Sequence, residues 1–362
     1  MTGRALAIGL MSGTSCDGVD AAVLETDGVD LVHAGEALSI DYRRDFRQRL
    51  RSALGDATAA EALAAELTDR HADAVRALLT KAGVAPLDVT VVGFHGQTIL
   101  HEPEKHRTLQ IGDGERLARA IGIDVVNDLR SADMAAGGEG APLAPLYHRA
   151  LAISLEKPLA VLNLGGVGNV TWIGEDRAGA MRLLAFDTGP GNALIDDWAM
   201  LHTGVPVDRD GRLAGAGQAN ASLLGRLLTN PYFSRPAPKS LDRDAFDASI
   251  LEGLSAADGA ATLVAFTAAT VARGAQLFPE PVKRWLVSGG GRQNPAIMAE
   301  LRRRLGTPVE PVEAVGWMGD QLEAQAFAYL AVRSLKGLPL SLPETTGVRR
   351  PTTGGRLHRW RQ

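Results

Sequence analysis

The strongest constraint on the fold of this chain is a pattern of strands and helices that occurs twice. Three strand-like runs, Ala5 to Ser12, Val19 to Thr26 and Val29 to Ile40, are separated by turns that contain Gly and Asp. A helical period over Thr58 to Ala82 follows, and strand, helix and strand then alternate as far as Val126. The first part of the chain therefore reads as a meander followed by alternating elements.

The same order returns in the second half. Strand-like runs cover Leu159 to Leu164, Val170 to Ile173, Arg182 to Phe186 and Arg284 to Ser288, with a short one near Val312, and helical periods lie near Ala193 to His202, Thr262 to Leu277, Pro295 to Leu305 and Gln321 to Ser334. Two such halves predict a duplicated α/β fold with mixed sheets, the actin-like (ribonuclease H-like) architecture, in which a nucleotide lies in a cleft between two domains. Two unrelated α/β domains are the alternative interpretation of the pattern.

The length of 362 residues also indicates two domains. The segment Ser131 to Pro145 is rich in small residues, Gly and Pro, and is typical of a flexible connection. We therefore expect one domain over 1–135 and a second over 136–335. The tail from Leu338 reads as irregular, and the segment of about 335–362 is able to return to the first domain.

Composition excludes several classes of protein. The net charge of -4 gives no general attraction to nucleic acid, and no apolar run is long enough for a membrane span, so we expect neither partner. Cys16 is the only cysteine, which rules out an intrachain disulfide and a cysteine-based zinc site. A reducing cytoplasm fits this usage.

The first motif that carries chemistry is the glycine- and hydroxyl-rich turn between the first two strands. Its candidates for nucleotide binding are Ser12, Gly13, Thr14, Ser15, Cys16, Asp17, Gly18, Val19 and Asp20. Glycines let backbone amides approach phosphate oxygens, and Asp17 or Asp20 could hold Mg²⁺ directly or through water. The turn is not a Walker A loop, because neither the lysine nor the helix follows. An ordinary hairpin turn is the alternative.

Two further glycine-rich turns lie in the second half. Asn163 to Val170 opens this half as the first motif opens the other, and it offers Gly165 and Asn169 as nucleotide-binding groups. The second turn, with Gly289, Gly290, Gly291 and Asn294, joins a strand to a helix and permits the flat approach of a purine or ribose. Asn294 as a helix cap before Pro295 is a compatible interpretation of the same residues.

A candidate base stands in the sequence Phe186 to Ala193. Asp187 follows an apolar strand and precedes a predicted helix, a position that suits a carboxylate accepting a proton from water or from a sugar hydroxyl. The alternative is that Asp187 and Asn192 are turn and capping residues.

Other polar groups end predicted strands or open the last helix, and such groups converge in folds of this kind. They include His95, Arg130 and Glu323. Taken singly, each also suits a structural role: a hydrogen-bonded histidine, a surface ion pair and a solvated acid of a first helical turn.

Seven segments, in this order, resemble the signature segments of the anhydro-N-acetylmuramic acid kinases: GLMSGTSCDGVD, GFHGQT, NDLR, NLGGVGN, FDTGPGN, SGGGRQN and GDQLEAQAFAYLA. The resemblance spans nearly the whole chain. It implies a cytoplasmic bacterial enzyme of peptidoglycan recycling that converts 1,6-anhydro-N-acetylmuramic acid, ATP and water into N-acetylmuramic acid 6-phosphate and ADP. A homodimer is compatible with this assignment.

The resemblance also assigns roles to individual residues. Asp187 would activate the water that attacks the anomeric carbon, and Arg130 would pair with the lactyl carboxylate. The residues that would line the sugar pocket are Thr98, Arg130, Val167, Gly168 and Glu323. An ordinary hexose or amino-sugar kinase is the enzymatic alternative. A sugar-responsive regulator without enzymatic activity is the other, although no helix-turn-helix precedes the strand at Ala5.

Overall fold

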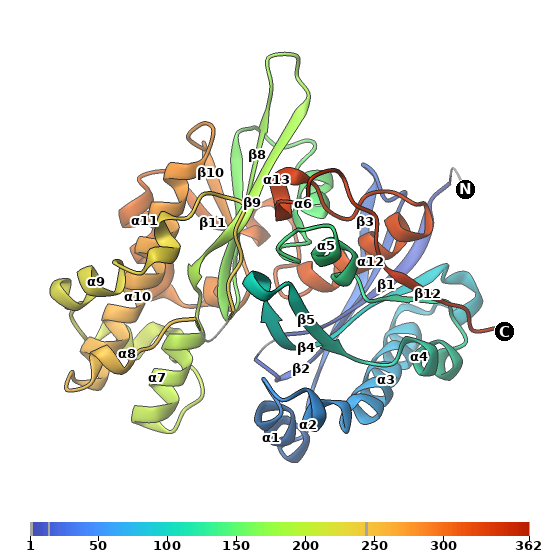
Figure 1. Cartoon of the computed structure of the whole chain (residues 1–362), viewed down its shortest axis with the longest axis horizontal. Coiled ribbons are helices and arrows are strands. Elements are labelled where there is room, and N and C mark those ends of the chain that lie inside the picture. Colours follow the sequence, from blue (N-terminus) through green and yellow to red (C-terminus); the bar gives the residue numbers. More distant parts are fainter. Residues whose placement is uncertain (1–2, 14, 243–244, 362) are drawn as a thin grey trace. The chain divides into compact units, whose positions relative to one another are not determined.

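The computed structural model describes residues 3–13, 15–242 and 245–361. The chain divides into two compact units (Figure 1). Unit 1 comprises Met1–Ser154 together with Asp320–Gln362, and unit 2 comprises Leu155–Gly319. Each unit has its own cluster of buried apolar side chains.

Unit 1 is built on a mixed sheet with the strand order β12-β6-β4-β1-β2-β3, and β5 pairs with β4. The strands are β1 (Ala5–Ser12), β2 (Gly18–Thr26), β3 (Val32–Asp41), β4 (Val91–Glu102), β5 (Arg107–Ile111), β6 (Val125–Asn127) and β12 (Arg356–His358). The first three form an antiparallel meander, while β4 runs parallel to β1 and β6 runs parallel to β4. The predicted meander is confirmed.

The helices of unit 1 are α1 (Arg44–Ser52), α2 (Ala57–Glu61), α3 (Ala64–Ala82), α4 (Gly114–Ile121), α5 (Ser131–Ala135), α6 (Pro145–Leu151), α12 (Leu322–Leu335) and α13 (Pro343–Thr346). Helix α12 packs on β1 and β4 so closely that two strand glycines are needed. A Cβ at Gly9 would lie 1.7 Å from the Ala324 carbonyl oxygen, and one at Gly93 would lie 2.1 Å from that of Phe327.

Unit 2 has a five-stranded sheet with the order β11-β10-β7-β8-β9. Its strands are β7 (Leu159–Leu164), β8 (Val167–Glu175), β9 (Met181–Pro190), β10 (Arg284–Ser288) and β11 (Val309–Pro311), and its helices are α7 (Ala193–Thr203), α8 (Arg212–Gly215), α9 (Ala221–Leu227), α10 (Ala256–Gly274) and α11 (Pro295–Leu305). Figure 1 shows the β8–β9 hairpin projecting beyond the other strands of the unit. The order matches β6-β4-β1-β2-β3 of unit 1, so the predicted duplication is confirmed in the sheet topology.

The units divide at positions other than those expected. The predicted hinge, Ser131 to Pro145, contains α5 and lies inside unit 1, and the chain passes to unit 2 only after Ser154. Helix α12 belongs to unit 1 because its buried face covers β1 and β4, which a helical period alone does not reveal. The tail is partly regular, since β12 pairs with β6.

Smaller departures concern single elements. Helix α1 and strand β5 were not expected, and the predicted helix from Thr58 to Ala82 is interrupted at Ala62 and Leu63. Among the helices of the described part of the chain, none combines the length and apolarity that crossing a membrane requires.

Candidate functional site

In unit 1 the turn between β1 and β2 begins at a buried hydrogen-bond network. Ser12 and Gln97 are register partners on parallel strands, and the Ser12 hydroxyl donates to Gln97 Oε1 at 2.6 Å. The Tyr42 hydroxyl donates to Ser12 Oγ at 2.9 Å, and Gln97 Nε2 donates to the Gly13 carbonyl at 3.0 Å. The Ser12 side chain therefore holds the base of the turn in place.

The rest of the turn separates into residues that face solvent and residues that face the core. Ser15 and Asp17 are exposed, while the side chains of Cys16 and Val19 belong to the buried cluster of unit 1. Cys16 has a φ of 51°, and its N–H donates to the Gly13 carbonyl at 3.0 Å. Cys16 and Val19 thus offer a ligand only backbone groups.

Thr14 and Gly18 are two further positions of the turn that were predicted to bind nucleotide. Thr14 lies outside the described residues. At Gly18, where β2 starts, a Cβ would lie 2.5 Å from the Ile40 carbonyl oxygen, so the close pairing with β3 requires glycine. That requirement is structural and leaves the role of Gly18 in binding a prediction.

Asp20 stands in an acidic environment. Burial raises the pKa of Asp20 to about 6, against the opposing hydrogen bond that the Ser39 hydroxyl donates to its carboxylate at 2.5 Å. The negative charges of Asp17, Asp320 and Asp41 raise it further. A bound cation would relieve this repulsion.

The carboxylates of the β1–β2 turn suit a Mg²⁺ ion that takes most of its ligands from water and from substrate phosphates. No group of three or more His, Cys, Asp or Glu side chains in the described residues could hold a metal ion by itself. Mg²⁺ commonly keeps several waters and takes one or two carboxylates together with substrate phosphates. Asp17 and Asp20 suit that arrangement and do not form a complete protein cage.

A second cluster in unit 1 joins His95 to Arg130. The buried His95 ring lies between the Gly96 carbonyl, 2.9 Å from Nδ1, and Arg130 Nε, which donates to Nε2 at 3.0 Å. This pairing assigns the proton to Nδ1. Burial, and then the Arg130 charge, hold the pKa of His95 well below its usual range. Arg130 is half-buried and also donates to the Gly140 carbonyl at 2.8 Å.

Glu323 opens α12 near both clusters. Its side chain is exposed in the first turn of the helix, as the alternative interpretation expects, yet the loss of water to neighbouring protein atoms raises the pKa of Glu323 to about 7. The charge of Asp20 raises the pKa further and that of Arg130 opposes it. The structure thus brings the β1–β2 turn, Arg130 and Glu323 into electrostatic contact. Thr98 accepts a hydrogen bond from Gln110 Nε2 at 3.3 Å on the β4–β5 ladder.

In unit 2 four polar residues form a row across the sheet. Ser288 on β10 is the register partner of Asn163 on β7, Asn163 that of Asn169 on β8, and Asn169 that of Asp187 on β9. Directly opposed residues share one face of a sheet. Ser288 and Asn163 lie at the carboxyl ends of parallel strands, the edge where α/β proteins place their ligands.

Asp187 is buried and held from three directions. Its N–H donates to the Lys239 carbonyl at 2.9 Å, its carbonyl accepts from the Tyr232 hydroxyl at 2.5 Å, and Oδ2 accepts from the Leu241 N–H at 2.8 Å. Helix α7 begins six positions later, and Asn192 makes no side-chain cap bond. The structure therefore contradicts the capping alternative for Asp187, whereas Asn192 stands at the N-cap position of α7 without a side-chain cap hydrogen bond.

The glycine turns of unit 2 pack against this row. The carbonyls of Gly165 and Gly166 accept from the N–H groups of Asn192 and Gly191 at 2.8 and 2.9 Å. Gly289 has a φ of 74°, and a Cβ there would lie 2.4 Å from Asn163 Oδ1.

The other glycines of these two turns differ in how much space surrounds them. A Cβ at Gly291 would lie 2.6 Å from Leu164 Cβ, whereas one at Gly290 would meet nothing closer than 3.3 Å. Gly168 is similarly tight, with a Cβ 2.8 Å from Thr188 Oγ1, while Val167 is half-buried. Asn294 caps α11, since its Oδ1 accepts from the N–H groups of residues 296 and 297, so the capping interpretation is confirmed.

Sequence reasoning did not single out Tyr42, Tyr232 or Lys239. Tyr42 follows β3 and bonds back to Ser12, and the other two lie on a Pro-rich segment without helical or strand period. Only the fold brings that segment to Asp187.

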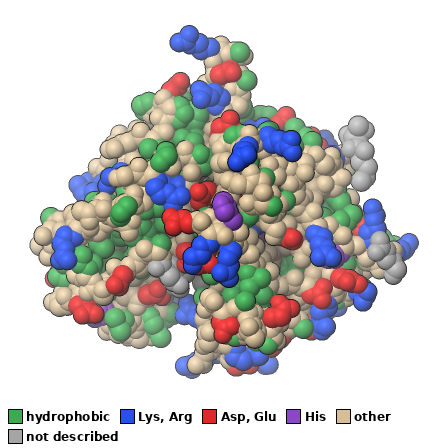
Figure 2. Space-filling view, viewed as in Figure 1, with side chains coloured by type: hydrophobic (Ala, Val, Ile, Leu, Met, Phe, Trp, Pro, Cys, Tyr) green, Lys and Arg blue, Asp and Glu red, His purple; other side chains and the backbone are tan. Residues whose placement is uncertain are grey.

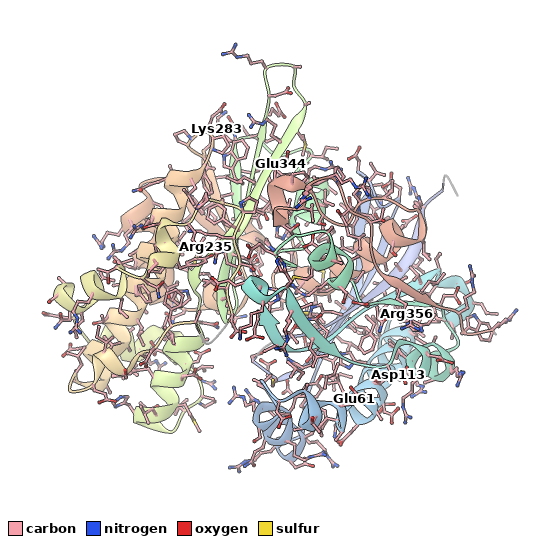
Figure 3. All side chains as sticks on the ribbon, viewed as in Figure 1. Glu61, Asp113, Arg235, Lys283, Glu344 and Arg356 are labelled. Atoms are coloured by element: carbon pink, nitrogen blue, oxygen red, sulfur yellow. The ribbon has the colours of Figure 1, made fainter. Side chains whose placement is uncertain are left out.

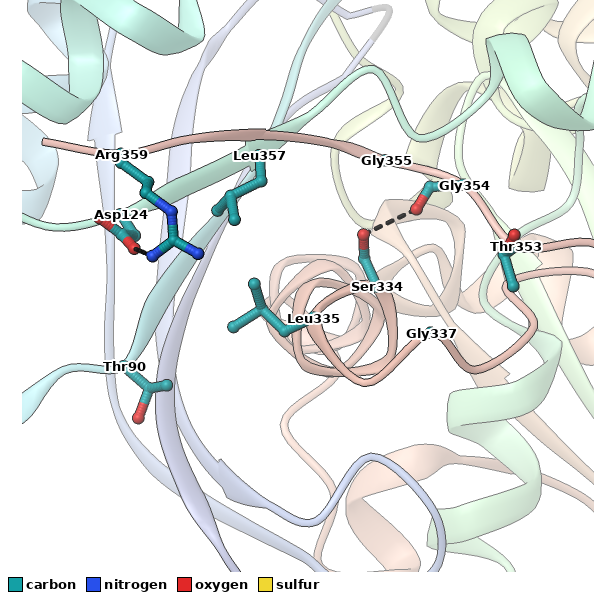
Figure 4. Close-up of a pocket in the computed structure, with 10 residues that line it drawn as sticks. All are labelled: Thr90, Asp124, Ser334, Leu335, Gly337, Thr353, Gly354, Gly355, Leu357 and Arg359. Atoms are coloured by element: carbon teal, nitrogen blue, oxygen red, sulfur yellow. Dashed lines mark hydrogen bonds and ion pairs between the residues drawn. The ribbon is translucent and has the colours of Figure 1, made fainter. Parts of the chain in front are cut away.

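A cavity of about 550 Å³ lies elsewhere in unit 1 (Figure 4). Thr90 and Asp124, which line it, directly precede β4 and β6, so it lies at the amino ends of strands whose carboxyl ends carry the candidate site. On one side of it Asp124 pairs with Arg359 at 3.5 Å, and elsewhere in its lining Ser334 donates to the Gly354 carbonyl at 2.7 Å (Figure 4). We do not assign the site to this cavity.

On the face in Figure 2, positive and negative side chains are interspersed and form no basic stripe.

Two units of one topology, with polar groups gathered at the carboxyl ends of parallel strands, define an actin-like α/β protein, the class that the sequence predicted. Solved structures with a similar chain path include component A of the Acidaminococcus fermentans (R)-2-hydroxyglutaryl-CoA dehydratase, 13% identical with a TM-score of 0.49 over 92% of this chain and 99% of that one. A ROK family glucokinase from Streptomyces griseus, in complex with glucose and AMPPNP, is 16% identical with a TM-score of 0.41 over 90% and 99%.

The family follows from the sequence as a whole. A family model described as Anhydro-N-acetylmuramic acid kinase matches residues 5–359. The anhydro-N-acetylmuramic acid kinase of Paramagnetospirillum magneticum is 60% identical over 98% of this chain and 99% of its own, and that of Rhodospirillum rubrum is 59% identical over 98% and 94%. The chain belongs to the anhydro-N-acetylmuramic acid kinase family, and the predicted family is confirmed.

Proposed function

We propose that this protein uses ATP and water to convert 1,6-anhydro-N-acetylmuramic acid into N-acetylmuramic acid 6-phosphate and ADP, as a step of peptidoglycan recycling in the cytoplasm. The names of its relatives support the substrate. The observation that carries the proposal is the fixed carboxylate of Asp187, the last of a row of polar groups that begins at the strand ends where α/β proteins commonly bind their ligands.

Asp187 acts as general base in the proposed reaction. It takes a proton from water as the water oxygen bonds to C1 of the sugar, and the bond from C1 to the bridging oxygen breaks. That oxygen, now O6, attacks the γ-phosphorus, and the bond to the β-phosphate oxygen breaks to release ADP. One carboxylate thus serves hydrolysis and transfer, because the departing O6 needs no separate deprotonation.

The remaining groups bind and orient. Backbone amides of the Ser12–Asp20 turn approach the phosphates, and Asp17 and Asp20 hold Mg²⁺, which neutralises phosphate charge when bound. Residues Gly165, Asn169 and Gly289 to Gly291 contact the nucleotide, and Asn294 supports them by holding the start of α11. Thr98, Val167, Gly168 and Glu323 line the sugar pocket, and Arg130 pairs with the lactyl carboxylate.

The decisive test replaces Asp187 by Asn, which removes the base and keeps the size of the side chain. We expect turnover of the anhydro sugar to fall by about 10²- to 10⁴-fold, the usual contribution of a general base, with ATP affinity and unfolding midpoint close to the parent's. Near-parental turnover would refute the proposed role of Asp187. In the parent reaction run in water labelled with oxygen-18, the label should enter C1 of the product and not the phosphate.

A panel of sugars separates this proposal from an ordinary hexose or amino-sugar kinase. The parent protein is incubated with ATP, Mg²⁺ and either the anhydro sugar, glucose or N-acetylglucosamine, and ADP release is measured. Phosphorylation of the simple sugars alone would contradict the proposed substrate while leaving the kinase class intact.

A further inference from the structure

Asp187 lies on strand β9, three residues before the strand ends at Pro190. Within the described residues, strand β9 is at the edge of its sheet, and one side of its backbone pairs with no strand there. Unpaired backbone groups at a sheet edge need another partner or water. At Asp187 the segment from Pro231 to Leu241 supplies the partners, since the N–H bonds the Lys239 carbonyl and the C=O accepts from the Tyr232 hydroxyl.

The same segment reaches the carboxylate itself. The Leu241 N–H donates to Asp187 Oδ2 at 2.8 Å, two residues after Lys239 has accepted from the Asp187 N–H at 2.9 Å. Main chain and side chain of Asp187 are therefore fixed by one short stretch. Neither group can turn without breaking a hydrogen bond to it.

Tyr232 is held firmly enough to serve this purpose. It is 7% exposed, and its ring makes edge-on contacts with Phe233 and Phe246 at centroid distances of 5.7 and 6.4 Å. Its hydroxyl lies 2.5 Å from the Asp187 carbonyl oxygen. An aromatic ring locked by its neighbours loses little freedom when it donates a hydrogen bond.

Lys239 contacts both the ring and the backbone carbonyl of Tyr232. It is 3% exposed, and its ammonium lies 4.4 Å from the centroid of the Tyr232 ring and donates to the Tyr232 carbonyl at 3.0 Å. Burial lowers the pKa of Lys239 to about 8, and the charges of Arg235 and Arg273 lower it further. Arg235, labelled in Figure 3, lies on the same segment. Burying the charge of Lys239 costs free energy of folding, and Lys239 contacts no substrate in the proposed reaction. We therefore expect its role to lie in the contacts with Tyr232.

We propose that Tyr232 and Lys239 are positioning residues that hold the Asp187 carboxylate in the orientation needed for its reaction. The proposal rests on the function proposed above for Asp187. Neither residue reacts. Tyr232 holds the backbone of Asp187 through its hydroxyl. Lys239 holds Tyr232, and its own carbonyl accepts from the Asp187 N–H, which places the Leu241 N–H two residues later beside the carboxylate.

The first test is Tyr232→Phe, which removes one hydroxyl from a ring whose packing stays. We expect kcat to fall at least tenfold while the KM values for ATP and sugar stay within about twofold, because a misplaced catalytic group affects the chemical step. Tyr147→Phe is the matched control. That variant also removes a buried phenol, which donates to Gln325 at 2.9 Å in unit 1, and it should keep the parent's kcat. An unchanged kcat in Tyr232→Phe overturns the proposal.

The second test separates positioning from stability. Lys239→Met keeps the length of the side chain and removes a desolvated charge, so we expect an unfolding midpoint at least as high as the parent's at pH 7. We expect kcat to fall at least fivefold all the same, and Lys239→Arg to recover part of it. A variant that loses kcat only in proportion to folded protein, or loses none, overturns the proposal.

Both tests use whichever sugar the parent protein phosphorylates. If the proposed substrate is wrong, the parent protein fails to phosphorylate the anhydro sugar. If the positioning proposal is wrong, the Tyr232 and Lys239 variants keep the parent's kcat. If Asp187→Asn itself keeps full turnover, the function proposed for Asp187 is the part that fails.

Discussion

At the scale of single residues, two acidic groups of unit 1, Asp20 and Glu323, are kept in a state that costs stability at neutral pH. The folded pKa of Asp20 is about 6 and that of Glu323 about 7, each above its ordinary value. The folded state therefore holds protons that the unfolded chain has already released. Proton binding by these two groups stabilises the folded state at low pH, and this stabilisation is lost as the pH rises from about 4 to 7.

Asp20→Asn removes one of these charges. We expect its free energy of unfolding to exceed the parent's by about 1–2 kcal/mol at pH 8 and by much less at pH 5, since one pKa unit corresponds to about 1.4 kcal/mol. Urea unfolding at the two pH values measures the difference. Asp88→Asn, at an exposed aspartate, serves as the control. A gain equal at both pH values would contradict the assignment, and Mg²⁺-dependent turnover should fall in Asp20→Asn alone.

At the scale of elements, the contact of α12 with β1 has no room for a side chain. Gly9→Ala would place a Cβ 1.7 Å from the Ala324 carbonyl oxygen, so helix and strand must separate. We expect a loss of about 3 kcal/mol, at the upper end of the usual cost of overpacking. Gly225→Ala is the control, because Gly225 lies in α9 with open space around it and should gain about 0.5–1 kcal/mol. Thermal unfolding of both variants measures the contrast, and a Gly9→Ala variant as stable as the parent would refute the packing.

Elements were predictable where the signal is local. The two meanders follow from runs of apolar and β-branched residues, and Asp187 stood out because it ends such a run. The unit to which α12 belongs was not predictable, since a helical period shows that a face is buried and not which sheet buries it. Tyr232 and Lys239 were missed for the same reason: they reach Asp187 from 45 and 52 positions along the chain, on a segment without period.

At the scale of the whole molecule, buried histidines are confined to unit 1. Burial lowers the pKa of His71 to about 4 and those of His101 and His148 to about 3, and it holds that of His95 well below its usual range, with the Arg130 charge lowering both His95 and His101 further. His202, the histidine of unit 2, is exposed. Because the unfolded chain protonates these side chains near pH 6.5 and the folded unit does not, their contribution to stability is lost as the pH falls below that value.

We therefore expect unit 1 to open before unit 2 on acidification. Each of the four histidines contributes up to about 1.4 kcal/mol per pH unit, which outweighs the opposite effect of Asp20 and Glu323 between about pH 5 and 6. Hydrogen exchange read by mass spectrometry at pH 7 and pH 5, corrected for intrinsic rates, measures protection unit by unit. Equal loss of protection in both units would contradict the assignment.

The division of the chain has a consequence for synthesis on the ribosome. Unit 2 is continuous in sequence, so all of it has been translated once residue 319 has been added. The first part of unit 1 is translated before unit 2, but α12 and β12 are translated only after it, and until then β1 and β4 stay without the helix that covers them. Although domains usually fold in the order of their synthesis, here the half that emerges first is the half that finishes last, and its apolar sheet is open to chaperones in the meantime.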